Sequence, residues 1–191
     1  MNLYIKQKSR RRPAIYISNL LLRKIKIFSP FSTNMRKAQL SKQLVAFSGE
    51  HYVAARIGLM GYVPLMTSSI SSRFPGSDIL VLNFATGKTI YVQVKTVSYQ
   101  KRVSWYVPEN VDGMEALFVF NKISEDKKSL ISYIAPSDIA AKESKEQRED
   151  YISTHPNVDR NQPRMIREDS LKNYLENWII FKERLGNPDG D

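Results

Sequence analysis

Apolar residues recur at intervals of three and four near the start of the chain and then give way to short apolar blocks and alternating runs. The first spacing, over 36–61, is that of one face of an α-helix, and Gly61 is a typical residue at a helix end. The stripe consists of Leu40, Leu44, Phe47, Ala54 and Ile57. The sequence therefore predicts a first helix over 36–61.

Short β-rich runs follow this helix. Tyr62–Met66 predicts a short strand, and the Ser-rich stretch 67–73 predicts a polar loop that ends in a Pro-Gly turn. Asp78–Asn83 and Thr89–Val97 are rich in β-branched residues and flank Ala85–Lys88, so they predict a hairpin.

The second half of the chain predicts a mixture of strands and helices. In chain order these are a strand over 103–107, a loop or short helix over 109–115, a hairpin of 116–120 with 129–134, a helix over 136–148, an irregular stretch over 151–163 and an amphipathic helix over 170–185. The apolar stripe of the last helix is Leu171, Tyr174, Leu175, Trp178 and Ile179. We find no internal repeat and no hinge, so residues 35–185 are predicted to form one domain, followed by a tail, 186–191, that frays.

Composition narrows the chemistry. The chain of 191 residues has no cysteine, which excludes disulfides, thiolate zinc sites and cysteine nucleophiles and fits a reducing cytoplasmic compartment. It has two histidines, His51 and His155, so a metal site would use oxygen ligands, and Mg²⁺ or Mn²⁺ is the expected ion. No apolar run approaches the length of a membrane span.

The net charge of +10 is concentrated at one end. Residues 1–37 hold ten of the 29 basic side chains and no acid, which leaves 19 basic and 19 acidic side chains in the rest. Three interpretations of the basic extension 1–34 stay open: a translation start at Met35 that makes it spurious or disordered, a nucleic-acid-binding arm or local structural element, and an organellar targeting segment.

Three polar features stand out between positions 49 and 95. Glu50 lies on or beside the apolar stripe of the first helix, where an unpaired carboxylate is costly to bury. Asp78 opens an apolar strand, and Gln93 and Lys95 lie two apart in a strand, so they share a face. Each feature alone has an ordinary structural explanation: a border position, the end of a turn, or a solvated strand face.

The hairpin brings these features together. A two-residue loop would place Asp78 opposite Lys95, whereas a four-residue loop would place it opposite Gln93. Either register puts Asp78 beside the Gln93 and Lys95 pair, and the preceding helix can set Glu50 over the same end of the sheet.

This combination resembles the PD-(D/E)xK nucleases, most closely the Mrr-type restriction endonucleases and archaeal Holliday-junction resolvases. The resemblance covers residues 40–97 and rests on Gly49-Glu50 in a helix, Gly76-x-Asp78 and Gln93-x-Lys95. Gln93 departs from the acidic residue of most members, although Mrr-like members also carry Gln. The resemblance implies an α/β fold with a restriction-endonuclease-like αβββαβ core, a mixed central sheet flanked by helices, and here an extra C-terminal helix.

The resemblance also implies a Mg²⁺- or Mn²⁺-dependent endonuclease that hydrolyses DNA phosphodiester bonds. Glu50, Asp78, Gln93 and the carbonyl of Val94 would hold the metal, and Lys95 would orient the attacking water and stabilise phosphate charge. Members are commonly dimers, so a homodimer is one expected arrangement. The DNA contacts are expected from residues near this hairpin end: Ser69, Ser72, Arg73, Lys101 and Arg102.

Two other hypotheses stay open. The chain is either a catalytically degenerate nuclease-fold module that binds nucleic acid or a protein partner in a defence or repair complex, or an unrelated α/β protein that uses its basic N-terminus on RNA. We expect Trp105 and Trp178 to be packing residues and His51 to be a structural neighbour of Glu50.

Overall fold

A computed structural model describes residues 30–67, 77–111, 115–126 and 128–190, with side chains from residue 41 onward. The chain divides into two compact units, Met1–Lys37 and Ala38–Asp191. Of the first unit only the helical backbone from Pro30 is described, and the extension 1–29 lies outside the described residues. In the part of the chain that is described, no helix is long and apolar enough to span a membrane.

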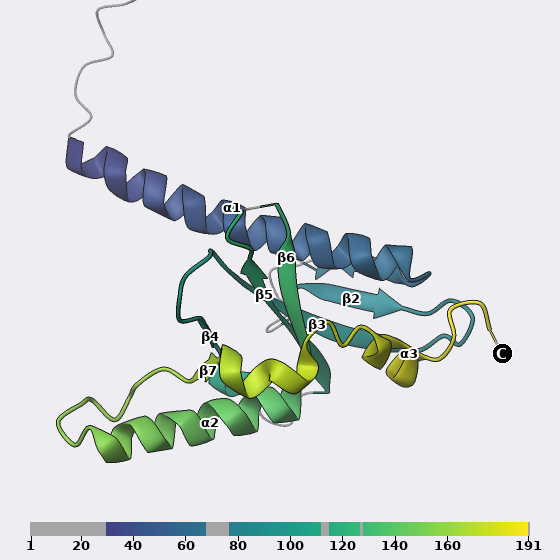
Figure 1. The fold of residues 1–191 in the computed structure, drawn as a ribbon. Coiled ribbons are helices and arrows are strands. Elements are labelled where there is room, and N and C mark those ends of the chain that lie inside the picture. Colours follow the sequence, from purple (N-terminus) through teal and green to yellow (C-terminus); the bar gives the residue numbers. More distant parts are fainter. Residues whose placement is uncertain (1–29, 68–76, 112–114, 127, 191) are drawn as a thin grey trace, which may run out of the picture. The chain divides into compact units, whose positions relative to one another are not determined.

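The second unit is built around a five-stranded sheet in the order β1-β2-β3-β5-β6 (Figure 1). The strands are β1 (Val63–Met66), β2 (Ile79–Leu82), β3 (Thr89–Val97), β5 (Ala116–Ile123) and β6 (Leu130–Pro136). Pairing is antiparallel except between β3 and β5, which run parallel, so the sheet is mixed as expected. A second, two-stranded sheet pairs β4 (Ser104–Tyr106) with β7 (Met165–Arg167).

The helices are α1 (Pro30–Leu59), α2 (Ser137–Thr154) and α3 (Ile179–Leu185), with 3₁₀ helices η2 (Glu109–Val111) and η3 (Glu168–Tyr174). The mixed α/β class is confirmed, but the specific αβββαβ order is not. In the described residues, β4 and the short η2 occupy the connection between β3 and β5, where that order places a helix.

Two apolar cores lie on the two faces of the sheet, and β5 contributes to both. Leu117 and Val119 belong to a core with residues of α1 and α3, whereas Phe118 and Phe120 belong to a core with residues of β4, β7 and α2. This alternation is what a strand buried on both faces requires. Trp178 and Trp105 lie in the first and second core respectively, as predicted for packing residues.

The predicted stripe of the first helix is partly wrong. Leu44 and Phe47 are 57% and 58% exposed, whereas Val53 and Ile57 are completely buried. Among the residues of α1 with described side chains, the buried line therefore begins at Gly49 and continues at four-residue spacing.

The predicted last helix, 170–185, is wrong over its first half. The chain forms η3, then has Leu175 in an extended conformation and a turn with Glu176 at a positive φ of 48°, and it becomes α-helical only at Ile179. The reason is tertiary: Leu175 forms a bridge to Tyr133, and the Glu176 N–H donates to the Ser132 carbonyl at the edge of β6. Leu175 and Ile179, expected on the buried stripe, are more than half exposed.

The tail after the last helix is also different from the expectation of fraying. Tyr62 Oη donates to the Gly186 carbonyl at 2.7 Å, and Asn83 Nδ2 donates to the Asn187 carbonyl at 3.0 Å. These bonds hold the start of the tail against the β1 and β2 end of the domain.

Candidate functional site

The hairpin of β2 and β3 has the longer of the two possible loops. Ile79 pairs with Val92, and Asn83 pairs with Lys88 across a four-residue connection. The Asn83 Oδ1 atom selects this loop, because it accepts the N–H groups of Ala85 and Thr86 at 2.9 and 3.4 Å.

Asp78 lies at an irregularity of the same hairpin. Its N–H donates to the Val92 carbonyl at 2.9 Å, although Val92 already pairs with Ile79. Two successive residues of one strand thus face one residue of the other, which is the arrangement of a β-bulge, and bulges re-aim side chains. This places the Asp78 carboxylate at the point where β2 begins and β3 continues.

The Asp78 carboxylate binds two donors of β3. Its Oδ2 accepts Gln93 Nε2 at 2.5 Å and the Val94 N–H at 2.7 Å. Gln93 is 5% exposed, so its amide is directed inside the protein rather than into solvent. The N–H and C=O of one strand residue point the same way, so the Val94 carbonyl also faces this edge. Asp78, Gln93 and Val94 therefore form one hydrogen-bonded group.

Glu50 reaches the same place because α1 lies very close to β3. A Cβ added to Gly49 would be 1.7 Å from Thr96 Oγ1 and 2.7 Å from Thr96 Cβ. Only a glycine fits at this contact, and it brings the next helical residue, Glu50, beside the strand that carries Lys95.

The charges of these groups lie close enough together to shift one another's pKa values. Burial raises the pKa of Glu50, and the negative charge of Asp78 raises it further, while His51 and Lys95 oppose this. Burial also raises the pKa of Asp78 against the opposing effects of the Val94 N–H, Lys95 and Gln93.

Lys95 shows the complementary behaviour. Burial lowers its pKa, and the charges of Asp78 and Glu50 act in the opposite direction. The structure thus brings together Glu50, Asp78, Gln93 and Lys95, and sequence reasoning missed only the Val94 N–H as a donor to Asp78. His51 is exposed, and its Nδ1 lies 2.9 Å from the Phe47 carbonyl.

The donor set suits a hard divalent cation. Two half-buried carboxylates repel each other, and an amide oxygen and a backbone carbonyl lie at the same edge, which are the ligand types of Mg²⁺ and Mn²⁺. Among the described residues, no group of three or more His, Cys, Asp or Glu side chains is placed to hold a metal ion. A metal ion bound here would have two acidic side chains, and the Gln93 amide is the side chain that could serve as a third ligand.

The expected nucleic-acid contacts divide into two groups. Ser69, Ser72 and Arg73 lie outside the described residues. Lys101 and Arg102 are exposed and lie in the loop between β3 and β4, so they are accessible to a ligand.

No family model and no curated protein matches the chain. Among solved structures, the chain is similar to a bacterial homing endonuclease, I-Ssp6803I, at 16% sequence identity and a TM-score of 0.44. The superposition covers 74% of this chain and 92% of that chain. A likeness at this level establishes neither a family nor an activity.

Proposed function

We propose that the chain is a metal-dependent endonuclease that hydrolyses DNA phosphodiester bonds with Glu50, Asp78, Gln93 and Lys95. The observation that carries this proposal is the group at the β2–β3 edge, where Asp78 is held by Gln93 and Val94. A carboxylate pair beside a partly desolvated lysine can hold a metal ion at a phosphate and transfer a proton at the same site.

Asp78 and Glu50 would hold Mg²⁺ or Mn²⁺, with the Gln93 amide oxygen and the Val94 carbonyl as further donors. The bound ion supplies positive charge at the phosphate and makes water a better nucleophile at neutral pH. The Gln93 Nε2 bond fixes the orientation of Asp78, so the amide both positions one ligand and presents its oxygen as another.

Lys95 is the residue that would handle the proton. Because burial lowers its pKa, its amine loses a proton more easily than an exposed lysine does. In its charged form it stabilises the negative charge that develops on the phosphate, and in its neutral form it accepts a proton from the attacking water.

The test is cleavage of DNA by the purified full chain with Mg²⁺ or Mn²⁺, on duplex, branched and single-stranded substrates. Asp78→Asn and Lys95→Ala should each lower the rate by about 100-fold or more, since losing one charge-stabilising group costs about 3 kcal/mol of transition-state stabilisation. Asp150→Asn and Lys145→Ala, at exposed positions of α2, are matched controls that should cleave like the unaltered protein.

The proposal fails if no DNA form is cut with either metal, or if the control and site variants are equally active. The neutral side chain at position 93 favours one second candidate, a degenerate module that binds DNA without cutting it. Metal-independent DNA binding that Lys95→Ala leaves unchanged, without cleavage, would support that candidate.

A further inference from the structure

The small sheet of β4 and β7 presents a polar outer face. Trp105 pairs with Ile166, and both are buried, with Trp105 Nε1 donating to the Asn121 carbonyl at 3.0 Å. Ser104 pairs with Arg167 one position away, so both side chains lie on the opposite, outward face. The buried tryptophan thus anchors a platform that carries an arginine and a hydroxyl.

This platform borders a cavity of about 460 Å³. Its lining residues are Lys101, Arg102, Val103, Ser104, Arg167, Glu168 and Asp169. Three cations and two acids therefore face one space whose volume is that of a ligand site rather than of a packing defect.

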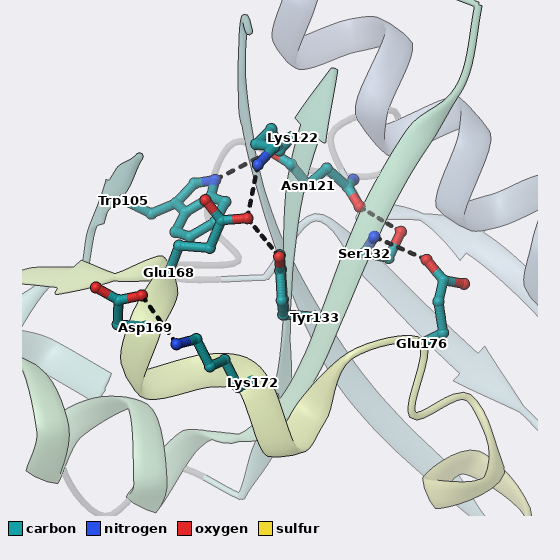
Figure 2. A network of polar contacts seen from close by, with 9 residues as sticks. All are labelled: Trp105, Asn121, Lys122, Ser132, Tyr133, Glu168, Asp169, Lys172 and Glu176. Atoms are coloured by element: carbon teal, nitrogen blue, oxygen red, sulfur yellow. Dashed lines mark hydrogen bonds and ion pairs between the residues drawn. The ribbon is translucent and has the colours of Figure 1, made fainter. Parts of the chain in front are cut away.

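Each of the two acids of the cavity already has a cationic partner. Glu168 Oε1 accepts Lys122 Nζ at 2.6 Å and Tyr133 Oη at 2.5 Å, and Asp169 lies 3.4 Å from Lys172 (Figure 2). Together these contacts show the carboxylate of Glu168 directed toward β5 and β6.

The cations of the cavity have no such partners among the described residues. Within the described part of the chain, Lys101, Arg102 and Arg167 make no ion pair with a carboxylate. The cavity therefore has an excess of positive charge, together with the neutral donor Ser104, and this combination suits an anion such as a phosphate.

The cavity is connected to the candidate site through one loop. Residues 98–103 join β3, which carries Lys95, to β4, which carries Ser104. A second cavity, of about 410 Å³, lies at the start of this loop, and its lining contains residues 96–100 and Lys42 of α1. Thr96, which lines this second cavity, also contacts Gly49, the helical neighbour of Glu50.

We propose that Lys101, Arg102, Ser104 and Arg167 form a phosphate clamp that holds the backbone of bound DNA away from the bond to be cut. The inference rests on the proposed nuclease function and deepens it, because it assigns the route along which the substrate strand leaves the site. Arg167, more than 60 positions beyond the site in sequence, is the clamp residue that only the fold reveals. The clamp contacts the phosphates of the DNA backbone and not the bases, so it contributes to affinity and register but not to sequence preference.

The test compares two triple variants that remove the same charge. The clamp variant carries Lys101→Gln, Arg102→Gln and Arg167→Gln, and the control variant carries Lys145→Gln, Arg160→Gln and Lys182→Gln at exposed positions outside both cavities. Binding of a short fluorescent DNA duplex is measured in EDTA by anisotropy over a range of salt concentrations, after circular dichroism has shown that both variants are folded.

In a plot of log affinity against log salt concentration, the slope for the clamp variant should be smaller in magnitude than that for the control variant by about 2 to 3. Each lost phosphate contact removes about 0.9 from the slope. Affinity at moderate salt should fall about tenfold or more, relative to the control. Equal slopes for the two variants, or an unaltered protein that does not bind the duplex, would overturn the clamp. A clamp effect without metal-dependent cleavage would leave the clamp standing and reject the nuclease function.

Discussion

Replacing Gly49 by alanine tests whether the close contact of α1 with β3 builds the site. The new Cβ would meet Thr96 Oγ1 at 1.7 Å and Thr96 Cβ at 2.7 Å. Rotation of the threonine side chain can remove the first contact but not the second, since the Thr96 Cβ is attached to the strand backbone. To reach an ordinary contact the helix must therefore move away from the strand by about 0.7 Å or more.

Two opposing effects set the size of the change. Alanine improves helix propensity by about 1 kcal/mol over glycine. Overpacking costs about 1 to 3 kcal/mol, and the severity of this contact places it at the upper end. We expect Gly49→Ala to lower the free energy of unfolding by about 1 to 2 kcal/mol. We also expect it to reduce cleavage, because Glu50 moves with the helix.

Gly58 provides a matched control in the same helix. A Cβ at this exposed position meets nothing within 4 Å, so Gly58→Ala should raise the free energy of unfolding by about 0.5 to 1 kcal/mol. Urea unfolding followed by circular dichroism measures both variants. If Gly49→Ala stabilises the protein as Gly58→Ala does, the close approach that places Glu50 beside Lys95 does not exist.

Two further predictions concern buried charges. Burial alone would raise the pKa of Glu168, but the hydrogen bonds from Lys122 and Tyr133 hold this pKa below its ordinary value of 4.5. Ionised Glu168 therefore stabilises the fold above about pH 4.5, and this stabilisation is lost as the pH falls through the pKa of the folded state. Glu168→Gln should therefore lower the free energy of unfolding, measured with urea, by about 1 to 2 kcal/mol at pH 7 and by clearly less at acidic pH. A loss of stability that does not change with pH would contradict this prediction. Gln93→Glu replaces the donor to Asp78 with a repelling carboxylate. Without metal, the free energy of unfolding should therefore fall by about 1 to 3 kcal/mol, whereas Mn²⁺ should stabilise this variant more than it stabilises the unaltered protein. Thermal unfolding with and without Mn²⁺ checks both effects, and an unchanged Mn²⁺ response would show that Gln93 does not face the metal.

The β2–β3 hairpin was predictable because its signals are local. Alternation places Gln93 and Lys95 on one face, and the β-branched run sets the limits of Thr89–Val97, which match β3. The choice between two loop lengths depended on Asn83, whose side chain caps the turn. An asparagine at the start of a turn is a readable signal that favours the longer loop.

The last helix was not predictable because its outcome depends on β6. The apolar spacing of Leu171, Leu175 and Trp178 fits a helix, yet the Ser132 N–H and the Trp178 Nε1–H both donate to the Glu176 carboxylate. These bonds hold Glu176 at a positive φ that interrupts a helix. Tertiary contacts here override a pattern that is correct only locally.

The candidate site falls between these cases. Spacing along the chain brings Asp78 to Gln93, but the position of Glu50 depends on how closely α1 approaches Thr96, which has no signature in sequence except Gly49 itself. Arg167 lies beside Ser104 only because β4 pairs with β7, and no local sequence pattern predicts that these two segments pair.

Anomalous diffraction from crystals of the full chain grown with Mn²⁺ can show whether Glu50, Asp78 and Gln93 bind a metal ion together. We expect a peak between the carboxylates of Asp78 and Glu50, within ligand distance of the Gln93 amide oxygen and beside Lys95, and its loss in Asp78→Asn. A manganese ion bound elsewhere, or Asp78 and Glu50 without a shared ion at saturating Mn²⁺, would show that these residues do not form a metal site.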